Sequence, residues 1–159
     1  MPEDINQISI LTRREIEARI AGPLIKAFME ELGSDKALMV VKRVIEPLAW
    51  ESGNQLAIQM GGNSMHDFAK GMKTYWESGG AYEKEELELS ETKYDFNVKL
   101  CRYAEMYKEL GLAELGFVIS CGRDFDMIKG FNPKMTLVRT KTIMEGEDHC
   151  DFRYYLHTD

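Results

Sequence analysis

The chain has 159 residues, of which 44% are hydrophobic and 30% charged, and its formal net charge is -7. These values fit one domain of ordinary soluble composition. The acidic balance argues against a nucleic-acid partner, because phosphate binding needs a basic surface. The longest apolar run, 37–41, is too short to span a membrane, and the acidic residues 1–4 do not resemble a signal peptide. The three cysteines indicate free thiols in a reducing cytoplasm.

Three helices are expected in the first half of the chain, after a loose arm at residues 1–11. Thr12 and Glu15 have the spacing of a capping box and begin the first helix. Apolar periodicity predicts a second helix over 35–60 and a third over 64–80. The apolar positions that define one face of the first helix are Ile16, Ile20, Leu24 and Phe28, and those expected to point inward from the second are Leu38, Val41, Ile45, Leu48 and Ala49.

The second half combines helices with strands. Strict alternation of apolar and polar residues predicts a β-hairpin over 84–100. Helices are expected over 101–110 and from 112 to 119, the latter running on toward 128. The β-prone segment 135–144 and the returning strand 149–157 then form a second hairpin around an acidic turn. The whole chain is therefore expected to be a single α+β domain, in which two β-hairpins form an antiparallel sheet with helices packed on one face.

A stretch near the C-terminus places an imidazole, a thiol, a carboxylate and a guanidinium within five residues. Because side chains alternate along a strand, Cys150 is expected to face the core, and His149, Asp151 and Arg153 the other side. A strand that begins one residue later would free His149 from this pattern. The alternative without a functional site is a buried Cys150 and an exposed ion pair of Asp151 with Arg153 or Lys141.

A second dense stretch contains Cys121 and Asp124, which share one face of a helix. Cys121 is a candidate nucleophile or metal ligand, and Asp124 a candidate general base. Cys121 and Cys150 could hold a divalent metal such as zinc, although no Cys-x-x-Cys spacing supports this, and buried core thiols are the alternative. The arginines that could grip a substrate carboxylate, unless surface salt bridges use them, are Arg123, Arg139 and Arg153.

Several short blocks in this order carry a resemblance to a known family. The most specific are Cys121-x-x-Asp124 and Cys150-Asp151-Phe152-Arg153. The others are residues 12–18, Cys101-Arg102-Tyr103, Glu109-Leu110-Gly111, Glu114-Leu115-Gly116, Gly130-Phe131-Asn132-Pro133 and Leu137-x-Arg139-Thr140. Together they resemble the L-2-amino-thiazoline-4-carboxylic acid hydrolase family.

The resemblance implies opening of a cyclic isothiourea carboxylate to N-carbamoyl-L-cysteine. Water attacks the carbon between nitrogen and sulfur, a base takes the proton, and the sulfur leaves. The roles that the resemblance suggests are a nucleophile or metal ligand at Cys121, a base or water-orienting group at Asp124, a second thiol at Cys150, an acid at His149, and a carboxylate grip at Arg153 or Arg139.

A different class of function is a non-enzymatic module that binds a small molecule and acts as a sensor. Converging cysteine, aspartate and arginine side chains would favour the hydrolase, whereas an apolar pocket with outward-pointing charges would favour the binding module. The expected partner is a small molecule in both cases, and a homo-oligomer is compatible with both.

Overall fold

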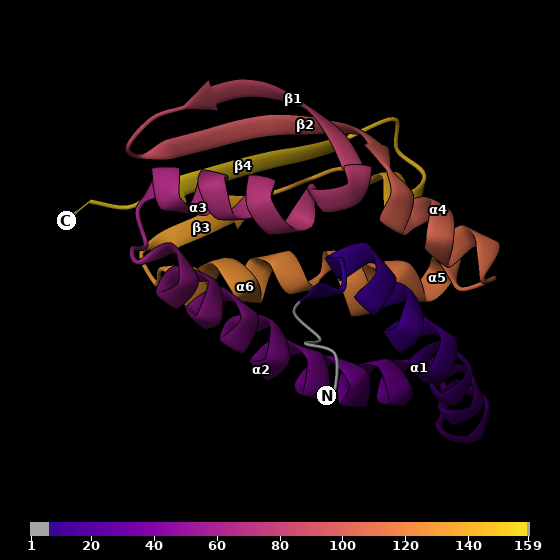
Figure 1. The fold of residues 1–159 in the computed structure, drawn as a ribbon. Coiled ribbons are helices and arrows are strands. Elements are labelled where there is room, and N and C mark those ends of the chain that lie inside the picture. Colours follow the sequence, from indigo (N-terminus) through magenta and orange to yellow (C-terminus); the bar gives the residue numbers. More distant parts are fainter. Residues whose placement is uncertain (1–6, 159) are drawn as a thin grey trace.

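A computed structural model describes residues 7–158, which form an antiparallel sheet with helices covering one of its faces (Figure 1). This confirms the predicted α+β class. None of the described helices is long and apolar enough to cross a membrane. The elements are α1 (Ile10–Leu32), α2 (Ser34–Met60), α3 (Met65–Gly71), the π-helical η2 (Met72–Trp76), η3 (Ser78–Gly80), β1 (Tyr82–Leu89), β2 (Lys93–Cys101), α4 (Arg102–Glu109), α5 (Ala113–Gly116), the π-helical η4 (Phe117–Cys121), α6 (Arg123–Phe131), β3 (Met135–Val138), η5 (Ile143–Glu145) and β4 (Cys150–Leu156).

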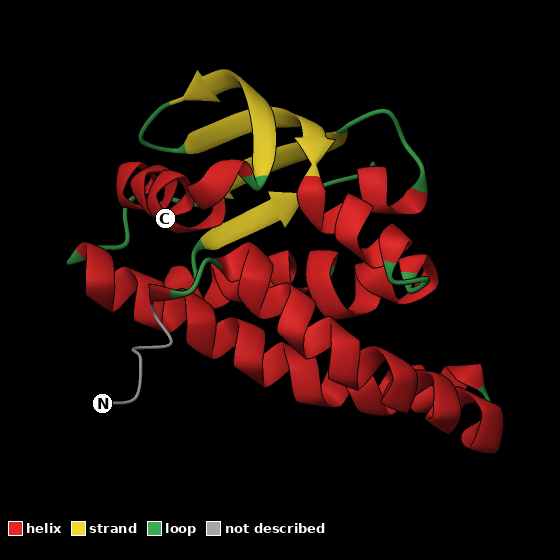
Figure 2. Ribbon diagram, turned by 45° about the vertical axis from the view of Figure 1, so that its right-hand side comes forward, coloured by secondary structure: helices red, strands yellow, loops and turns green. Residues whose placement is uncertain are grey.

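The four strands lie in the order β1-β2-β4-β3, and every neighbouring pair is antiparallel. Helices cover one face of this sheet (Figure 2). The alternation of the strands places aromatic side chains on the buried face, as predicted. Phe96 of β2 lies opposite Phe152 of β4, and their ring centroids are 4.9 Å apart. Tyr94 and Tyr154 form the next such pair, and both are fully buried. This aromatic layer is the floor on which α3 and α6 pack.

The second hairpin differs from the prediction, because β3 ends at Val138 instead of continuing to residue 144. The carboxylate of Asp151 accepts hydrogen bonds from the amides of Thr140 and Lys141, at 2.8 and 2.6 Å, and from the Thr140 hydroxyl at 2.6 Å. A side chain of β4 thus takes the place of a backbone partner, and the strand pairing stops. Residues 139–149 become a long connection instead of a tight turn.

Close contact between α2 and α6 sets the position of α6 beneath the sheet. A Cβ atom at Gly53 would lie 1.8 Å from the Met127 carbonyl oxygen, and one at Gly130 would lie 1.9 Å from the Trp50 carbonyl oxygen. Only glycine allows the two backbones to approach this closely. The predicted helix from 112 toward 128 runs on to Phe131, through α5, η4 and α6.

Helix α1 begins and packs differently from the prediction. Its N-cap is Ser9, whose hydroxyl accepts a hydrogen bond from the Thr12 amide at 3.1 Å, so the helix starts before Thr12 and includes part of the expected arm. Residues 1–6 of that arm lie outside the described part of the chain. The buried face of α1 carries Arg14, Ala18, Gly22 and Ile25.

The large apolar residues of the opposite face of α1 are exposed, although their periodicity suggests a core face. The predicted inward position of Leu48 in α2 is also wrong, since this residue is 53% exposed. The cause is the size of the residues at the helix contact: a Cβ atom at Gly22 would lie 2.4 Å from the Leu112 side chain. Small residues on α1 therefore form the close contact, and the bulkier ones are left outside.

Candidate functional site

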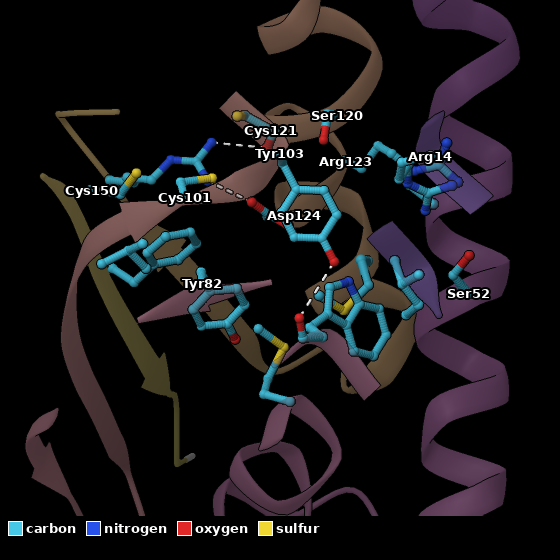
Figure 3. A pocket seen from close by; sticks show the side chains of 18 of the residues that line it. Arg14, Ser52, Tyr82, Cys101, Tyr103, Ser120, Cys121, Arg123, Asp124 and Cys150 are labelled. Atoms are coloured by element: carbon cyan, nitrogen blue, oxygen red, sulfur yellow. Dashed lines mark hydrogen bonds and ion pairs between the residues drawn. The ribbon is translucent and has the colours of Figure 1, made fainter. Parts of the chain in front are cut away.

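A cavity of about 80 Å³ lies between the inner face of the sheet and the helices (Figure 3). Its walls come from α1, α2, α6, the strands, and both π-helical segments. η2 contributes Met72 and Trp76, and η4 contributes Ser120 and Cys121. π-Helical turns often occur at functional sites, because they shift side chains out of the regular helical register.

Asp124 and Arg139 form an ion pair in the wall of this cavity. Asp124 Oδ2 lies 2.5 Å from Arg139 Nη1, and the side chains are 19% and 1% exposed. Burial raises the pKa of Asp124, although the Arg139 charge and hydrogen bond oppose that rise. The carboxylate is therefore desolvated and held in one orientation, which suits a group that accepts a proton.

Arg139 is fixed from several directions. Its Nη2 donates to the Cys121 carbonyl oxygen at 2.9 Å. Its guanidinium also lies over the rings of Phe125 and Phe152, at 5.1 and 4.8 Å from their centroids. With its charge paired and its planar face stacked, Arg139 has little capacity left for a substrate, so the structure does not favour its predicted role as a carboxylate grip.

All three cysteines line the same cavity and are free. Burial raises the pKa of Cys101 and Cys121, and raises that of Cys150 to about 11. The Ile143 amide also donates to Cys150 Sγ at 3.3 Å. The thiols are therefore protonated near neutral pH, which disfavours a thiolate nucleophile at Cys121.

The donor set around these thiols does not fit a metal centre. Among the described residues, no group of three or more histidine, cysteine, aspartate or glutamate side chains is placed to hold an ion. The zinc site considered for Cys121 and Cys150 therefore lacks further ligands of these types, and we derive no step through a metal.

Two residues that the sequence placed in the site lie elsewhere. Arg153 projects from the opposite face of the sheet, where it donates to the Phe96 carbonyl oxygen at 2.9 Å and to Asn97 Oδ1 at 2.9 Å. Strand alternation forces this, because Phe152 faces the cavity. His149 precedes β4, and its Nδ1 lies 2.7 Å from Asp148 Oδ1. Neither residue lines the cavity, so neither can grip or protonate a substrate there.

Sequence reasoning missed Arg14 as a site residue. It lies on the buried face of α1, and its side chain is 11% exposed. Arg123 of α6 lies beside it, so burial and the neighbouring Arg14 charge lower the pKa of Arg123 to about 10 (Figure 3). The sequence did contain a signal for this position. Arg14 lies four residues before Ala18, so it shares the face of α1 that carries the small residues Ala18 and Gly22.

Aromatic groups complete the lining. Tyr103 donates from its hydroxyl to the Trp76 carbonyl oxygen at 3.4 Å. Tyr82 also lines the cavity, and its buried hydroxyl has no hydrogen-bond partner among the described residues. Burial raises the pKa of Tyr82 well above its ordinary value, so the hydroxyl remains a donor. The cavity thus combines aromatic walls with a few fixed polar groups, the usual character of a small-molecule site.

The structure is an α+β fold with a pocket between the sheet and the helices, lined by apolar, aromatic and charged side chains. The chain belongs to the L-2-amino-thiazoline-4-carboxylic acid hydrolase family, whose model matches residues 13–154. No curated protein matches the chain significantly.

Two solved structures share the fold at low sequence identity. One is the phenol-responsive sensory domain of the transcription activator PoxR with phenol, at 12% identity and a TM-score of 0.55, covering 86% of this chain and 72% of that one. The other is trafficking protein particle complex subunit 3 from Naegleria fowleri, covalently bound to palmitic acid, at 14% identity and a TM-score of 0.54, covering 92% of this chain and 96% of that one.

Proposed function

We propose that the chain is a hydrolase that opens a small ring at a carbon bonded to both nitrogen and sulfur, with L-2-amino-thiazoline-4-carboxylate as the substrate that the family name suggests. The observation that carries this proposal is the Asp124 carboxylate, which is desolvated in a cavity wall and held by Arg139. Burial is a general means of raising a carboxylate pKa toward the range that general-base catalysis needs.

The proposed reaction uses water as the nucleophile. Asp124 accepts a proton as water oxygen bonds to the carbon between nitrogen and sulfur, and returns that proton to the ring nitrogen. In the second step the new hydroxyl gives its proton to Asp124, the carbonyl forms, and the carbon–sulfur bond breaks. The sulfur takes the proton from Asp124, so the product is N-carbamoyl-L-cysteine. Arg139 keeps the carboxylate oriented throughout.

Cys121 is assigned no covalent step. Its raised pKa keeps it a thiol, and a neutral thiol is a weak nucleophile. We place it in the pocket wall beside Asp124, where the protonated sulfur contacts the ring. The three free thiols also support a reducing cytoplasm as the location.

The test is product formation by three variants, followed by mass spectrometry. Asp124→Asn should lower turnover by roughly 100-fold or more, the scale of a lost general base. Cys121→Ala should retain most of it. Asp126→Asn is the matched control, because Asp126 lies two residues away and pairs with Lys129 at 3.1 Å outside the cavity. Full turnover by Asp124→Asn would rule out the assigned base.

The second candidate is a sensor or binding module without turnover. The cavity wall includes five aromatic residues and its thiols are protonated, features that a pocket that only binds could also have. The two proteins of similar fold are described in complex with phenol and with palmitic acid, which is a reason to test this alternative. A ligand that raises the melting temperature but is recovered unchanged after prolonged incubation would support it over the hydrolase.

A further inference from the structure

The cavity has an excess of positive charge. Among the described residues that line it, there are three arginines but a single carboxylate, Asp124. Arg139 uses that carboxylate. The remaining arginines, Arg14 and Arg123, therefore lack a partner within the lining, although the chain as a whole carries a net charge of -7.

The positive charges of these two arginines are only partly compensated by nearby carboxylates. Arg14 Nη1 lies 2.6 Å from Glu17 Oε2, but the Glu17 side chain is 46% exposed. No hydrogen bond or ion pair joins Arg123 to another residue of the described chain. The charges of Glu17 and Asp124 act on Arg123 but do not outweigh its burial and the neighbouring Arg14 charge, which together lower its pKa. Partly buried like charges are unfavourable unless an anion compensates them.

We propose that Arg14 and Arg123 bind the carboxylate of the substrate, so that the ligands of this site are small anions with a flat, partly apolar body. This rests on the proposed function for the identity of the substrate. Guanidinium groups hold carboxylates through paired N–H donors. The aromatic wall accepts the ring, and the unpartnered Tyr82 hydroxyl donates to a ring nitrogen or oxygen.

The test is equilibrium binding, so it does not depend on turnover. Calorimetry compares two acids with their uncharged or decarboxylated counterparts: L-2-amino-thiazoline-4-carboxylate against 2-amino-2-thiazoline, and benzoate against benzamide. The Asp124→Asn background prevents hydrolysis of the first acid. A protein that keeps both Arg14 and Arg123 should bind at least one of the two acids roughly 10–100-fold more tightly than the counterpart of that acid. This is the scale of a charge-assisted hydrogen bond.

Arg123→Gln should remove this preference, whereas Arg153→Gln, on the other face of the sheet, should keep it. Without ligand, Arg123→Gln should melt at the same temperature or higher, because it relieves repulsion from Arg14. Preference for the acid in the Asp124→Asn background, together with no hydrolysis by the protein that retains Asp124, would support the anion site and contradict the proposed function. Weak or absent binding of both acids, or a preference that survives Arg123→Gln, would overturn the anion site.

A second inference comes from the outer surface of α1 and α2, which lie farthest from the sheet (Figure 1). We call this surface the outer stripe. Its residues recur every four positions and are 45–66% exposed. They are Ile16, Ile20, Leu24, Phe28 and Leu32 of α1, and Val40, Val44 and Leu48 of α2.

The area of the outer stripe matches what a dimer buries. The exposed fractions of the eight residues sum to the surface of about four fully exposed residues. At roughly 150–250 Å² for a large side chain, this is an apolar area on the order of 800 Å². The largest apolar patch on a typical monomer is roughly 300–600 Å², whereas each partner of a standard interface buries about 800 Å². A groove of about 360 Å³ between α1 and α2 is lined by five residues of the stripe, namely Leu24, Phe28, Leu32, Val40 and Val44. The stripe therefore has a hollow beside its ridge.

We infer that the outer stripe binds a second copy of this chain in an isologous homodimer. Residues four apart on an α-helix form a ridge inclined to the helix axis. In an isologous dimer, the same patch of both copies meets about a twofold axis. The ridge of one α1 would lie in the α1–α2 groove of the other copy.

Sedimentation equilibrium of the full chain at micromolar concentration tests this inference. The wild type should have twice the mass of 18.3 kDa. The double variant Ile20→Glu, Leu24→Glu should be monomeric with an unchanged circular dichroism spectrum, because both residues are already exposed. Leu87→Glu on β1, at a residue 50% exposed, is the control and should remain dimeric. A monomeric wild type, or a dimer that persists in the double variant, would overturn it.

Discussion

Arg139 Nη1 lies 2.5 Å from Asp124 Oδ2, and the arginine side chain is only 1% exposed. The two residues come from the connection after β3 and from the first turn of α6. Their contact joins the sheet to the helical layer at the wall of the cavity. The Arg139 charge and hydrogen bond oppose the rise in the Asp124 pKa that burial causes.

Replacing Arg139 with methionine should destabilise the protein strongly. The variant leaves the Asp124 carboxylate desolvated without its counter-ion, and breaking a buried ion pair by removing one partner costs about 3–5 kcal/mol. Urea unfolding followed by circular dichroism measures the loss. The double variant Arg139→Met, Asp124→Asn should recover part of it, since the unpaired charge is gone. Equal stability of wild type and Arg139→Met would show that the pair contributes nothing.

As the pH is lowered, the proposed hydrolase should begin to lose activity at a pH above the ordinary pKa of an aspartate. The base must be ionised, and burial raises the pKa of Asp124 from its usual value. The log of kcat/KM should therefore drop as pH decreases through this raised pKa, instead of near pH 4. A pH profile on wild type measures the acidic limb. A profile that stays flat down to pH 4 would assign the proton transfer to another group.

The three thiols should react slowly with Ellman's reagent at pH 7. Each has a pKa raised by burial, so the thiolate fraction is small. The Cys150 rate should increase as pH rises toward about 11. In denaturant all three should react quickly, which provides the internal control. Fast reaction of the Cys121 thiol in the native protein at pH 7 would instead support Cys121 as the nucleophile.

Asp151→Ala should cost about 1–3 kcal/mol, because it removes the acceptor of hydrogen bonds from Thr140 and Lys141. Burial raises the pKa of Asp151, but these hydrogen bonds outweigh it and lower the pKa overall. Its contribution is therefore present above the unfolded pKa and is lost as pH falls through the folded value. Denaturant titrations at pH 7 and pH 3 should show a smaller penalty at pH 3. Asp148→Ala, whose side chain is 82% exposed, should cost little at either pH.

Sequence periodicity predicted the layers of the fold better than it predicted their contacts. The alternation around Tyr94 and Phe96 correctly identified the buried face of β2. The four-residue repeat of α1 did not identify its core face, because hydrophobicity marks any apolar surface, including one that faces a partner. The close approach at Gly22 depends on Leu112, 90 residues away, and short-range patterns carry no such information.

The candidate site was only partly predictable for the same reason. Cys121 and Asp124 are three residues apart, so helical geometry placed them together. Arg153 was misplaced although strand alternation already pointed it away from Cys150. Arg14 was missed because its proximity to Arg123, 109 positions later in the chain, arises only from the tertiary fold.

The most direct measurement of the central claim is a paired assay on L-2-amino-thiazoline-4-carboxylate with wild type and Asp124→Asn. Ligand binding and N-carbamoyl-L-cysteine are measured in the same samples. Both proteins should bind the ligand, and only the wild type should form product at an appreciable rate. Equal product formation by both proteins, or binding without product in the wild type, would contradict it.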